Sequence, residues 1–226
     1  MDVPLPALAL LGGTGAEGSG LALRFAHAGF PVTIGSRSLD KAQSVADELN
    51  TELDGGAISA AANLAAAEAA DIAVLTVPYA AQQATALEVA SVLHGKILVD
   101  ATVPLVPPKV GRVQLPEGGS AVAALQLALG NQVRVVSAFQ NVGAQHLREV
   151  GHGIDCDVLV CSDDVEAREM VVQLARAIGL RAWHAGPLAN SAAAEALTSV
   201  LISINRRHKV PGSGIRITGV DDESKS

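Results

Sequence analysis

Aromatic side chains are scarce in this sequence, since only 2% of its 226 residues are Phe, Trp or Tyr. Proteins that bind single-stranded nucleic acid usually stack the bases on aromatic rings, so this scarcity disfavours that class. Basic residues are also outnumbered, because 16 Lys and Arg stand against 23 Asp and Glu, a formal net charge of -7. Nucleic acid or an acidic membrane would require a positive surface. We therefore expect no nucleic-acid partner and no membrane partner.

Long apolar runs and cysteines are few as well. No apolar run reaches the length of a membrane span. The sequence begins MDVPLP, with an acid where a secretion signal would carry positive charge. Cys156 and Cys161 are five residues apart, on opposite faces of an expected strand, so they suit neither a disulfide nor a shared metal. They are typical of core thiols, and we expect a cytoplasmic protein.

The sequence also lacks the residue patterns of nucleophilic and metal catalysis. No Ser-His-Asp or Cys-His set occurs at a recognisable spacing, and the six histidines are scattered. We therefore expect no metal and no catalytic acid, base or nucleophile. A site of this kind suits a hydride that passes directly between two aligned rings.

Aliphatic residues are plentiful, and they form short apolar runs that alternate with helical stretches. Apolar residues make up 49% of the chain and charged residues 17%, which suits a sheet buried on both faces. The alternation predicts an α/β fold, a Rossmann-type doubly wound parallel sheet with a small C-terminal α/β extension. The expected strands are 8–12, 31–35, 71–77, 96–101, 133–139, 157–161 and 180–186, and the expected helices are 16–28, 38–50, 59–69, 79–93, 120–129, 163–178 and 188–207.

A glycine-rich turn follows the first expected strand, where three glycines form the pattern G-x-G-x-x-G before the first expected helix. Such a turn lets the pyrophosphate of a dinucleotide approach the backbone, at a helix N-terminus with free N–H groups and a positive dipole end. An ordinary glycine-rich turn is the alternative, and the strand-to-helix context disfavours it. The cofactor-binding residues expected here are Gly13, Thr14, Gly15, Ala16, Glu17 and Gly18.

Residues after the second expected strand decide which dinucleotide is bound. An NAD site places Asp or Glu there for the ribose 2′-hydroxyl, whereas this chain has Ser36 and Arg37, with Lys41 one helical turn later. A hydroxyl, a guanidinium and an ammonium group are typical of a site for a 2′-phosphate. Two solvated basic residues at a helix start are the alternative. The sequence therefore predicts NADP(H) as the cofactor.

The segments after the third and fourth expected strands lie at the same edge of the sheet as the glycine turn, where ligands bind in open parallel sheets. Asp100 has no partner placed for catalysis, and capping of the following turn is the alternative role for it. The Pro- and Gly-rich segment 103–120 is expected to be a loop that either partly covers a ligand or only connects two elements. The residues expected to line the cofactor cleft are Thr76, Val77, Pro78 and Thr102.

The last expected helix carries a stripe of polar residues with little charge. Ser191, Glu195, Thr198 and Asn205 fall on one face of it. Two interpretations stay open, a hydrogen-bonding wall toward a ligand and an ordinary solvent-facing side. The basic run NRRHK at 205–209 either holds an anionic substrate tail or only interacts favourably with the helix dipole.

Six segments together resemble the NADPH-dependent coenzyme F-420 (F420) reductases, also called F-420H2:NADP oxidoreductases. They are LLGGTGAEGSGLALRFA, IGSRSLDKA, DIAVLTVP, VSAFQNV, DVLVCSDD and AGPLANSAAAEALTSVLISIN, in the same order along nearly the whole chain. The resemblance implies an oxidoreductase that transfers a hydride reversibly between NADP(H) and F420, an 8-hydroxy-5-deazaflavin. It also implies a homodimer.

Carried over by position, the resemblance gives roles to individual residues. Thr14 and Gly15 would contact the pyrophosphate, Pro78 and Val142 would lie beside the nicotinamide, and Thr198 matches a deazaflavin hydrogen-bonding position. The residues expected to bind the deazaflavin or another substrate are Gln140, Asn141, Ser191, Glu195 and Thr198.

The chain departs from the archaeal members at three of the implied ring-site positions. Gln140 stands where they have a His, and Ala192 and Ala196 stand where they have an Arg and a Ser. Gln140 can still donate and accept hydrogen bonds, whereas the alanine side chains cannot. Two other functions stay open for this reason: an NADPH-dependent reductase of another small molecule, such as an imine, ketone or enone, and a non-catalytic NADPH sensor.

The same resemblance implies how the chain is organised. Residues 1–140 are expected to form the NADP-binding Rossmann domain. Residues 141–220 are expected to form a small C-terminal domain that completes the deazaflavin or substrate cleft. The tail DDESKS, residues 221–226, is charged and lacks apolar residues, so we expect it to be disordered.

Overall fold

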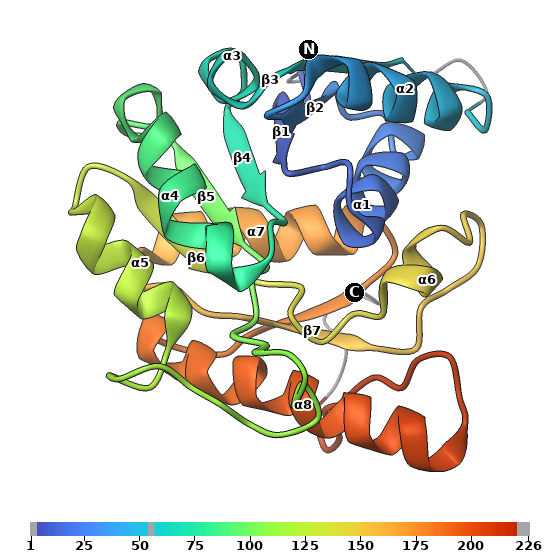
Figure 1. Cartoon of the computed structure of the whole chain (residues 1–226), viewed down its shortest axis with the longest axis vertical. Helices are drawn as coiled ribbons and strands as arrows, with labels where there is room; N and C mark the ends of the chain where they lie inside the picture. The colour runs from blue at the N-terminus through green and yellow to red at the C-terminus, as the bar shows by residue number, and fades with distance from the viewer. Residues whose placement is uncertain (1–3, 54–56, 221–226) are drawn as a thin grey trace.

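The computed structural model describes residues 4–53 and 57–220, so the tail 221–226 lies outside the described residues. Six parallel strands form one sheet in the order β3-β2-β1-β4-β5-β6 (Figure 1). The strand order reverses between β1 and β4, the position at which doubly wound sheets bind ligands. The strands are β1 (Leu8–Leu11), β2 (Val32–Ser36), β3 (Ile58–Ala62), β4 (Ile72–Leu75), β5 (Ile97–Asp100) and β6 (Arg134–Ser137).

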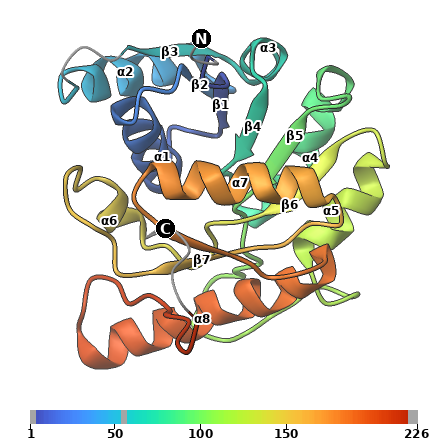
Figure 2. The ribbon, with the colours of Figure 1, turned by 180° about the vertical axis from the view of Figure 1, so that it is seen from behind.

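Helices cover both faces of this sheet (Figures 1 and 2). Alternate residues of β1 point to opposite faces, since Leu8 and Leu10 belong to one buried cluster and Ala9 and Leu11 to the other. The first face is covered by α1 (Ala16–His27), α2 (Leu39–Asn50) and α7 (Val165–Ala177), and the second by α3 (Asn63–Ala69), α4 (Tyr79–Val89) and α5 (Ala121–Leu129). The α/β doubly wound fold expected from the sequence is confirmed.

The C-terminal part adds a second, two-stranded parallel sheet, formed by β7 (Asp157–Val160) and β8 (Arg181–His184). Its core residues belong to the same buried cluster as the first face of the large sheet. The remaining helices are the short α6 (Ala144–Leu147) and the long α8 (Ser191–His208). Loop 103–120 runs along α8 (Figure 1), and Ser203 of α8 donates a hydrogen bond to Gly111 of the loop. In the part of the chain that is described, no helix is both long and apolar enough to span a membrane.

The expected helix 59–69 is wrong in its first part, because Ile58–Ala62 form the edge strand β3 and only Asn63–Ala69 are helical. Alanine favours a helix. However, the side-chain amide of Asn50 bonds both the N–H and the carbonyl of Ile58, at 2.7 and 2.9 Å. Those bonds hold Ile58 in register with β2, so strand pairing overrides the local propensity.

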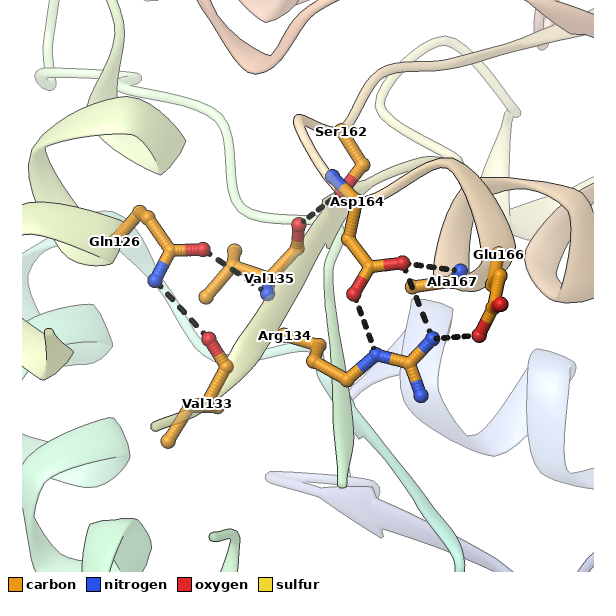
Figure 3. A network of polar contacts seen from close by, with 8 residues as sticks. All are labelled: Gln126, Val133, Arg134, Val135, Ser162, Asp164, Glu166 and Ala167. Atoms are coloured by element: carbon orange, nitrogen blue, oxygen red, sulfur yellow. Dashed lines mark hydrogen bonds and ion pairs between the residues drawn. The ribbon is translucent and has the colours of Figure 1, made fainter. Parts of the chain in front are cut away.

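The other edge strand, β6, has its free backbone groups occupied by side chains (Figure 3). Gln126 of α5 donates to the carbonyl of Val133 and accepts from the N–H of Val135, at 3.0 and 3.1 Å. The hydroxyl of Ser162 donates to the carbonyl of Val135. The backbone groups of Val133 and Val135 are therefore not available to pair with another strand. Edge strands avoid association in this way.

Ion pairs of Arg134 with Asp164 and Glu166 join β6 to the start of α7 (Figure 3). Asp164, an expected helix cap, accepts from the N–H of Ala167 and is bonded in addition by the guanidinium of Arg134 at 2.7 and 3.1 Å. The hydrogen bonds from Arg134 lower the pKa of Asp164, so the cap is a carboxylate at neutral pH. These contacts fix α7 on the first face of the sheet.

Candidate functional site

The three glycines of the G-x-G-x-x-G turn have different surroundings. A Cβ on Gly13 would lie 2.7 Å from a backbone oxygen, and a Cβ on Gly18 would lie 2.5 Å from the hydroxyl of Thr76. Both positions therefore need glycine for the packing of the protein itself. A Cβ on Gly15 would meet nothing closer than 3.8 Å, and Gly15 is exposed. The space beside Gly15 is thus open to a ligand at the N-terminus of α1, which begins at Ala16.

Two unpaired cations lie where β2 meets α2. The side chains of Arg37 and Lys41 are exposed, and neither has a hydrogen bond or ion pair within residues 4–53 and 57–220. The hydroxyl of Ser36 accepts from the N–H of Ser38, and the hydroxyl of Ser38 in turn caps α2 by accepting from the N–H of Lys41. Two free positive groups beside a helix N-terminus form a site for an anion.

The ends of β4 and β5 lie next to the glycine turn. The hydroxyl of Thr76 donates to the carbonyl of Leu11 at 3.1 Å, and that of Thr102 to the carbonyl of Val77 at 3.4 Å. Pro78 is exposed at the start of α4. The expected cleft residues are thus brought together at one edge of the sheet, beside the turn that begins α1.

Asp100 is fully buried and serves the turn that follows it. Its carboxylate accepts from the N–H of Thr102 at 2.8 Å and from the amide of Gln82 at 2.5 Å. Burial raises the pKa of Asp100 to about 6, against the lowering effect of the hydrogen bonds from Thr102 and Gln82. The alternative role of a turn cap is therefore confirmed. Across the described stretches, no group of three or more His, Cys, Asp or Glu could hold a metal.

A strained turn at the end of β6 carries Gln140. Phe139, which is buried, has a φ of +74°, a conformation that a bulky side chain rarely adopts. The side-chain amide nitrogen of Gln140 donates to the carbonyl of Asp100 at 2.7 Å, which fixes the orientation of the amide. Its Oε1 atom is buried and has no hydrogen-bond partner. A buried acceptor without a hydrogen bond costs the free protein free energy of folding. Such an acceptor suits a hydrogen-bond donor on a bound ligand.

Helix α8 holds this turn in place. The amide of Asn141 donates to the carbonyl of Ala194 at 2.7 Å and to the hydroxyl of Thr198 at 3.2 Å. The hydroxyl of Thr198 donates to the carbonyl of Gln140 at 2.7 Å. The single proton of that hydroxyl is therefore engaged within the protein, and Thr198 acts on a ligand through the turn that it positions.

Ser191 and Glu195, in contrast, are packed against α5. Both are almost fully buried. The carboxylate of Glu195 accepts from the N–H of Ala121 at 2.8 Å and from the hydroxyl of Ser120 at 2.7 Å, and Ser191 lies 2.6 Å from that hydroxyl. These contacts cap α5 and hold it against α8. The structure thus gives both residues a structural role, and their contact with a ligand stays a prediction.

A cavity of about 450 Å³ opens next to the 139–142 turn. It is lined by Gly143, which follows Val142, and by Cys156, whose thiol donates to the carbonyl of Asn141 at 3.3 Å. The C-terminal segment 212–216 forms another wall, in which the hydroxyl of Ser213 is buried without a partner. This segment was not predicted as part of a site, and the G-x-G pattern within PGSG at 211–214 was the signal in the sequence for it.

Glu17 places a carboxyl group in the first turn of α1, directly after the glycine turn. Its Oε1 atom is buried and has no hydrogen-bond partner. Burial raises the pKa of Glu17 to about 8, so the group is mostly neutral at pH 7. A neutral carboxyl group can lie beside a pyrophosphate without repelling it, whereas a carboxylate cannot.

We expect the affinity for NADP(H) to fall as Glu17 loses its proton. Because the pKa is raised, the neutral form dominates below about pH 8, and the dissociation constant should rise by about tenfold between pH 8 and pH 9.5. The same shift lowers the stability of the free protein as pH rises toward 8, because Glu17 ionises in the unfolded chain while it stays neutral in the folded protein. The measurement is an NADPH titration at several pH values, with Glu17→Gln as the control that should show a flat profile. An identical pH dependence in both proteins would contradict the prediction.

Three comparisons with known proteins agree with this geometry. The family model described as "NADP oxidoreductase coenzyme F420-dependent" matches residues 7–104. The F420-dependent NADP reductase of Methanothermobacter thermautotrophicus is 41% identical over 96% of this chain and 96% of its own length, and that of Methanothermobacter marburgensis is 40% identical over 95% and 99%. A putative F420-dependent NADP-reductase from Arthrobacter sp. FB24 has a similar fold, with a TM-score of 0.79, 23% identity, and coverage of 94% of this chain and 99% of that one.

Proposed function

Because the chain belongs to the family of F420-dependent NADP reductases and is an oxidoreductase that moves a hydride between NADP(H) and F420, we propose which residues bind NADP(H) and which residues bind F420. The nicotinamide and the deazaflavin supply the hydride chemistry, so the protein's part is to bind and align them. The observation that carries the proposal is the strained 139–142 turn, which is held by α8 and lies next to the cavity. No side chain is assigned as acid, base or nucleophile.

In the NADP(H) half, the start of α1 binds the pyrophosphate and the start of α2 binds the 2′-phosphate. The open space beside Gly15 supports the first assignment, and the unpaired side chains of Arg37 and Lys41 support the second. The nicotinamide lies at the carboxyl edge of β4, β5 and β6. The proposed NADP(H) residues are Gly13, Thr14, Gly15, Ala16, Glu17, Gly18, Ser36, Arg37, Lys41, Thr76, Val77, Pro78, Thr102 and Val142.

In the deazaflavin half, the ring occupies the cavity beside Gly143 and Cys156. The orphaned Oε1 of Gln140 accepts a hydrogen bond from an N–H group at the ring pair, and Asn141 and Thr198 keep Gln140 in position. The buried wall of the turn also keeps water from the space between the rings. Ser191 and Glu195 contribute indirectly, because they fix α8 against α5.

The assignment of Thr198 is tested by Thr198→Val, which removes the hydroxyl and keeps the shape. In an assay that follows bleaching of F420 by NADPH, we expect KM for F420 to rise about five- to tenfold, the worth of one hydrogen bond, and KM for NADPH to stay unchanged. Thr198→Ser keeps the donor and should restore the wild-type KM. A loss confined to NADPH, or a Thr198→Ser variant as impaired as Thr198→Val, would contradict the role.

The domain division, the homodimer and the cytoplasmic location belong to the same proposal. Residues 1–140 form the NADP(H) half, and residues 141–220 supply the cavity and α8. Exposed apolar side chains on α8, Val200 and Ile204 at 43% and 40% exposure, support association with a second copy. The buried free thiols of Cys156 and Cys161 suit a reducing compartment.

A further inference from the structure

The three phenylalanines of the chain pack against one another in a single row, named the Phe row. Phe25 of α1 packs edge-to-face on Phe30, with ring centroids 5.8 Å apart and planes at 76°, and on Phe139, at 6.3 Å and 82°. All three are buried, at 8% exposure or less. Because the chain has only three Phe among its 226 residues, every one of them serves to connect α1 to the turn after β6, in a geometry that aromatic rings favour.

The Phe row ends at a strained backbone position. Phe139 has a φ of +74° and is 1% exposed. Lys209, the other non-glycine residue with a positive φ in the described residues, is exposed and ends α8, where this conformation is ordinary. A glycine would adopt the φ of Phe139 at no steric cost. The burial of the Phe139 ring and its edge contact with Phe25 therefore compensate for the strain of the backbone that carries it.

The strained residue turns the chain back onto the end of β5. The N–H of Ala138 and the side-chain amide of Gln140 donate to the same carbonyl, that of Asp100, at 3.3 and 2.7 Å. A continuing strand would carry residue 140 roughly 6.6 Å beyond residue 138 along β5. The N–H of Val142 then closes the turn by donating to the carbonyl of Phe139 at 3.1 Å. The positive φ of Phe139 is thus what returns the amide of Gln140 to Asp100.

The turn has a second support, from α8, that acts on other atoms. The hydroxyl of Thr198 donates to the main-chain carbonyl of Gln140, and the amide of Asn141 donates to the carbonyl of Ala194. These bonds fix the turn relative to α8, whereas the Phe row fixes it relative to α1. The Oε1 atom of Gln140 is buried without a hydrogen-bond partner. Its position depends on both supports.

We propose that Phe139 is a positioning residue for hydride transfer, because the Phe row keeps the turn in its left-handed conformation and so holds the Oε1 of Gln140 in place beside the ring pair. The proposal rests on the proposed function, since it takes Gln140 as a residue next to the two rings. Phe139 acts through Gln140 and not on a ring directly. A shift of about 1 Å in a positioning group can slow a reaction strongly, so relaxation of the turn lowers the rate of transfer more than the binding of NADPH.

The test is single-turnover bleaching of F420 by enzyme-bound NADPH, which separates the transfer from binding and product release. Phe139→Leu keeps an apolar side chain and removes the ring, so the strain loses its compensation. We expect the rate constant of hydride transfer to fall about tenfold and the dissociation constant of NADPH to stay within about twofold of wild type. Phe25→Leu removes the same edge contact from α1 and should lower the rate by a similar factor. Either variant carries the test if the other does not fold.

Phe30→Leu is the matched control. It removes the other edge contact of Phe25 and leaves the contact with the turn intact. Thermal unfolding scans should show a loss of stability in Phe30→Leu as in Phe139→Leu, because both rings are buried. At a temperature where both variants are folded, Phe30→Leu should transfer the hydride at the wild-type rate. A purely structural role of the Phe row would slow neither variant or both alike, and either result would overturn the inference.

A double-mutant cycle with Gln140→Leu shows whether Phe139 acts through Gln140. Once the amide is absent, Phe139→Leu should cause no further loss of rate, whereas independent effects would multiply and would overturn the inference. A wild-type rate in Phe139→Leu beside a slow Gln140→Leu would overturn the inference alone. A wild-type rate in Gln140→Leu would contradict the proposed role of Gln140 itself, and the inference would fall with it, so the two failures are distinguishable.

Discussion

Arg37→Glu is expected to lower kcat/KM for NADPH by about 100-fold or more and to change kcat/KM for NADH by less than about threefold. A charge-assisted hydrogen bond to a phosphate contributes about 1.5–3 kcal/mol, and a carboxylate in its place adds repulsion. Every 1.4 kcal/mol is a factor of about ten. NADH lacks the 2′-phosphate, so the substitution neither removes a hydrogen bond to that cofactor nor adds repulsion.

The stability of the Arg37→Glu protein should match that of the wild type. The Arg37 side chain is exposed and makes no hydrogen bond or ion pair in the described residues, so its replacement should cost the fold little. The measurements are initial rates with both cofactors and a thermal unfolding scan. Arg37→Gln and Lys41→Gln should each give a smaller loss for NADPH. Equal losses of kcat/KM for NADPH and NADH would show that the 2′-phosphate does not bind at this site.

The local patterns of the sequence were enough to predict most of the sheet. Short aliphatic runs predict β1, β4 and β5 within a few residues, because a strand that is buried on both faces is apolar throughout. The edge strand β3 could not be predicted, since its alanine-rich sequence also suits a helix and only Asn50 and β2 decide the outcome. Helix α6 is a single turn and has no periodicity to detect.

The positions of the residues proposed to bind NADP(H) were predictable for a related reason. The glycines and cations among them lie within a few residues of strand ends, so their positions follow from the order of the elements. The polar stripe of α8 was harder to interpret. Thr198 faces the 139–142 turn, whereas Ser191 and Glu195 face α5, and a helical wheel cannot tell which neighbour will cover each of them. The cavity wall at 212–216 depends on contacts with α6 that are distant in sequence.

Arg24 links the two halves of the protein, and no pattern in the sequence predicted this role. Arg24 lies in α1 and is only 6% exposed. Its guanidinium donates to five backbone carbonyls, which belong to α6, to the segment after α6 and to the end of α7. Their distances are 3.0 Å to Leu147, 2.8 Å to His146, 2.8 Å to Glu149, 3.1 Å to His152 and 3.4 Å to Ile178.

Arg24→Met is expected to lower the free energy of unfolding by about 3–5 kcal/mol, because it leaves these carbonyls buried without donors. For a chain of this size, that corresponds to a fall in the unfolding midpoint of roughly 8–15 °C. Arg148→Met is the matched control. Arg148 pairs with Glu48 and Glu52 at the surface, where an ion pair contributes less than about 1 kcal/mol.

Urea unfolding of Arg24→Met and Arg148→Met measures the difference directly. At a temperature where Arg24→Met is still folded, KM for F420 should rise more than KM for NADPH, because α6 and the segment after it line the cavity. A loss in Arg24→Met as small as that in Arg148→Met would mean that the carbonyls find other donors. In that case α6 would be held by its close packing on Gly20, where a Cβ would lie 2.6 Å from Leu147, and the arginine would not be what joins the cofactor half to the cavity.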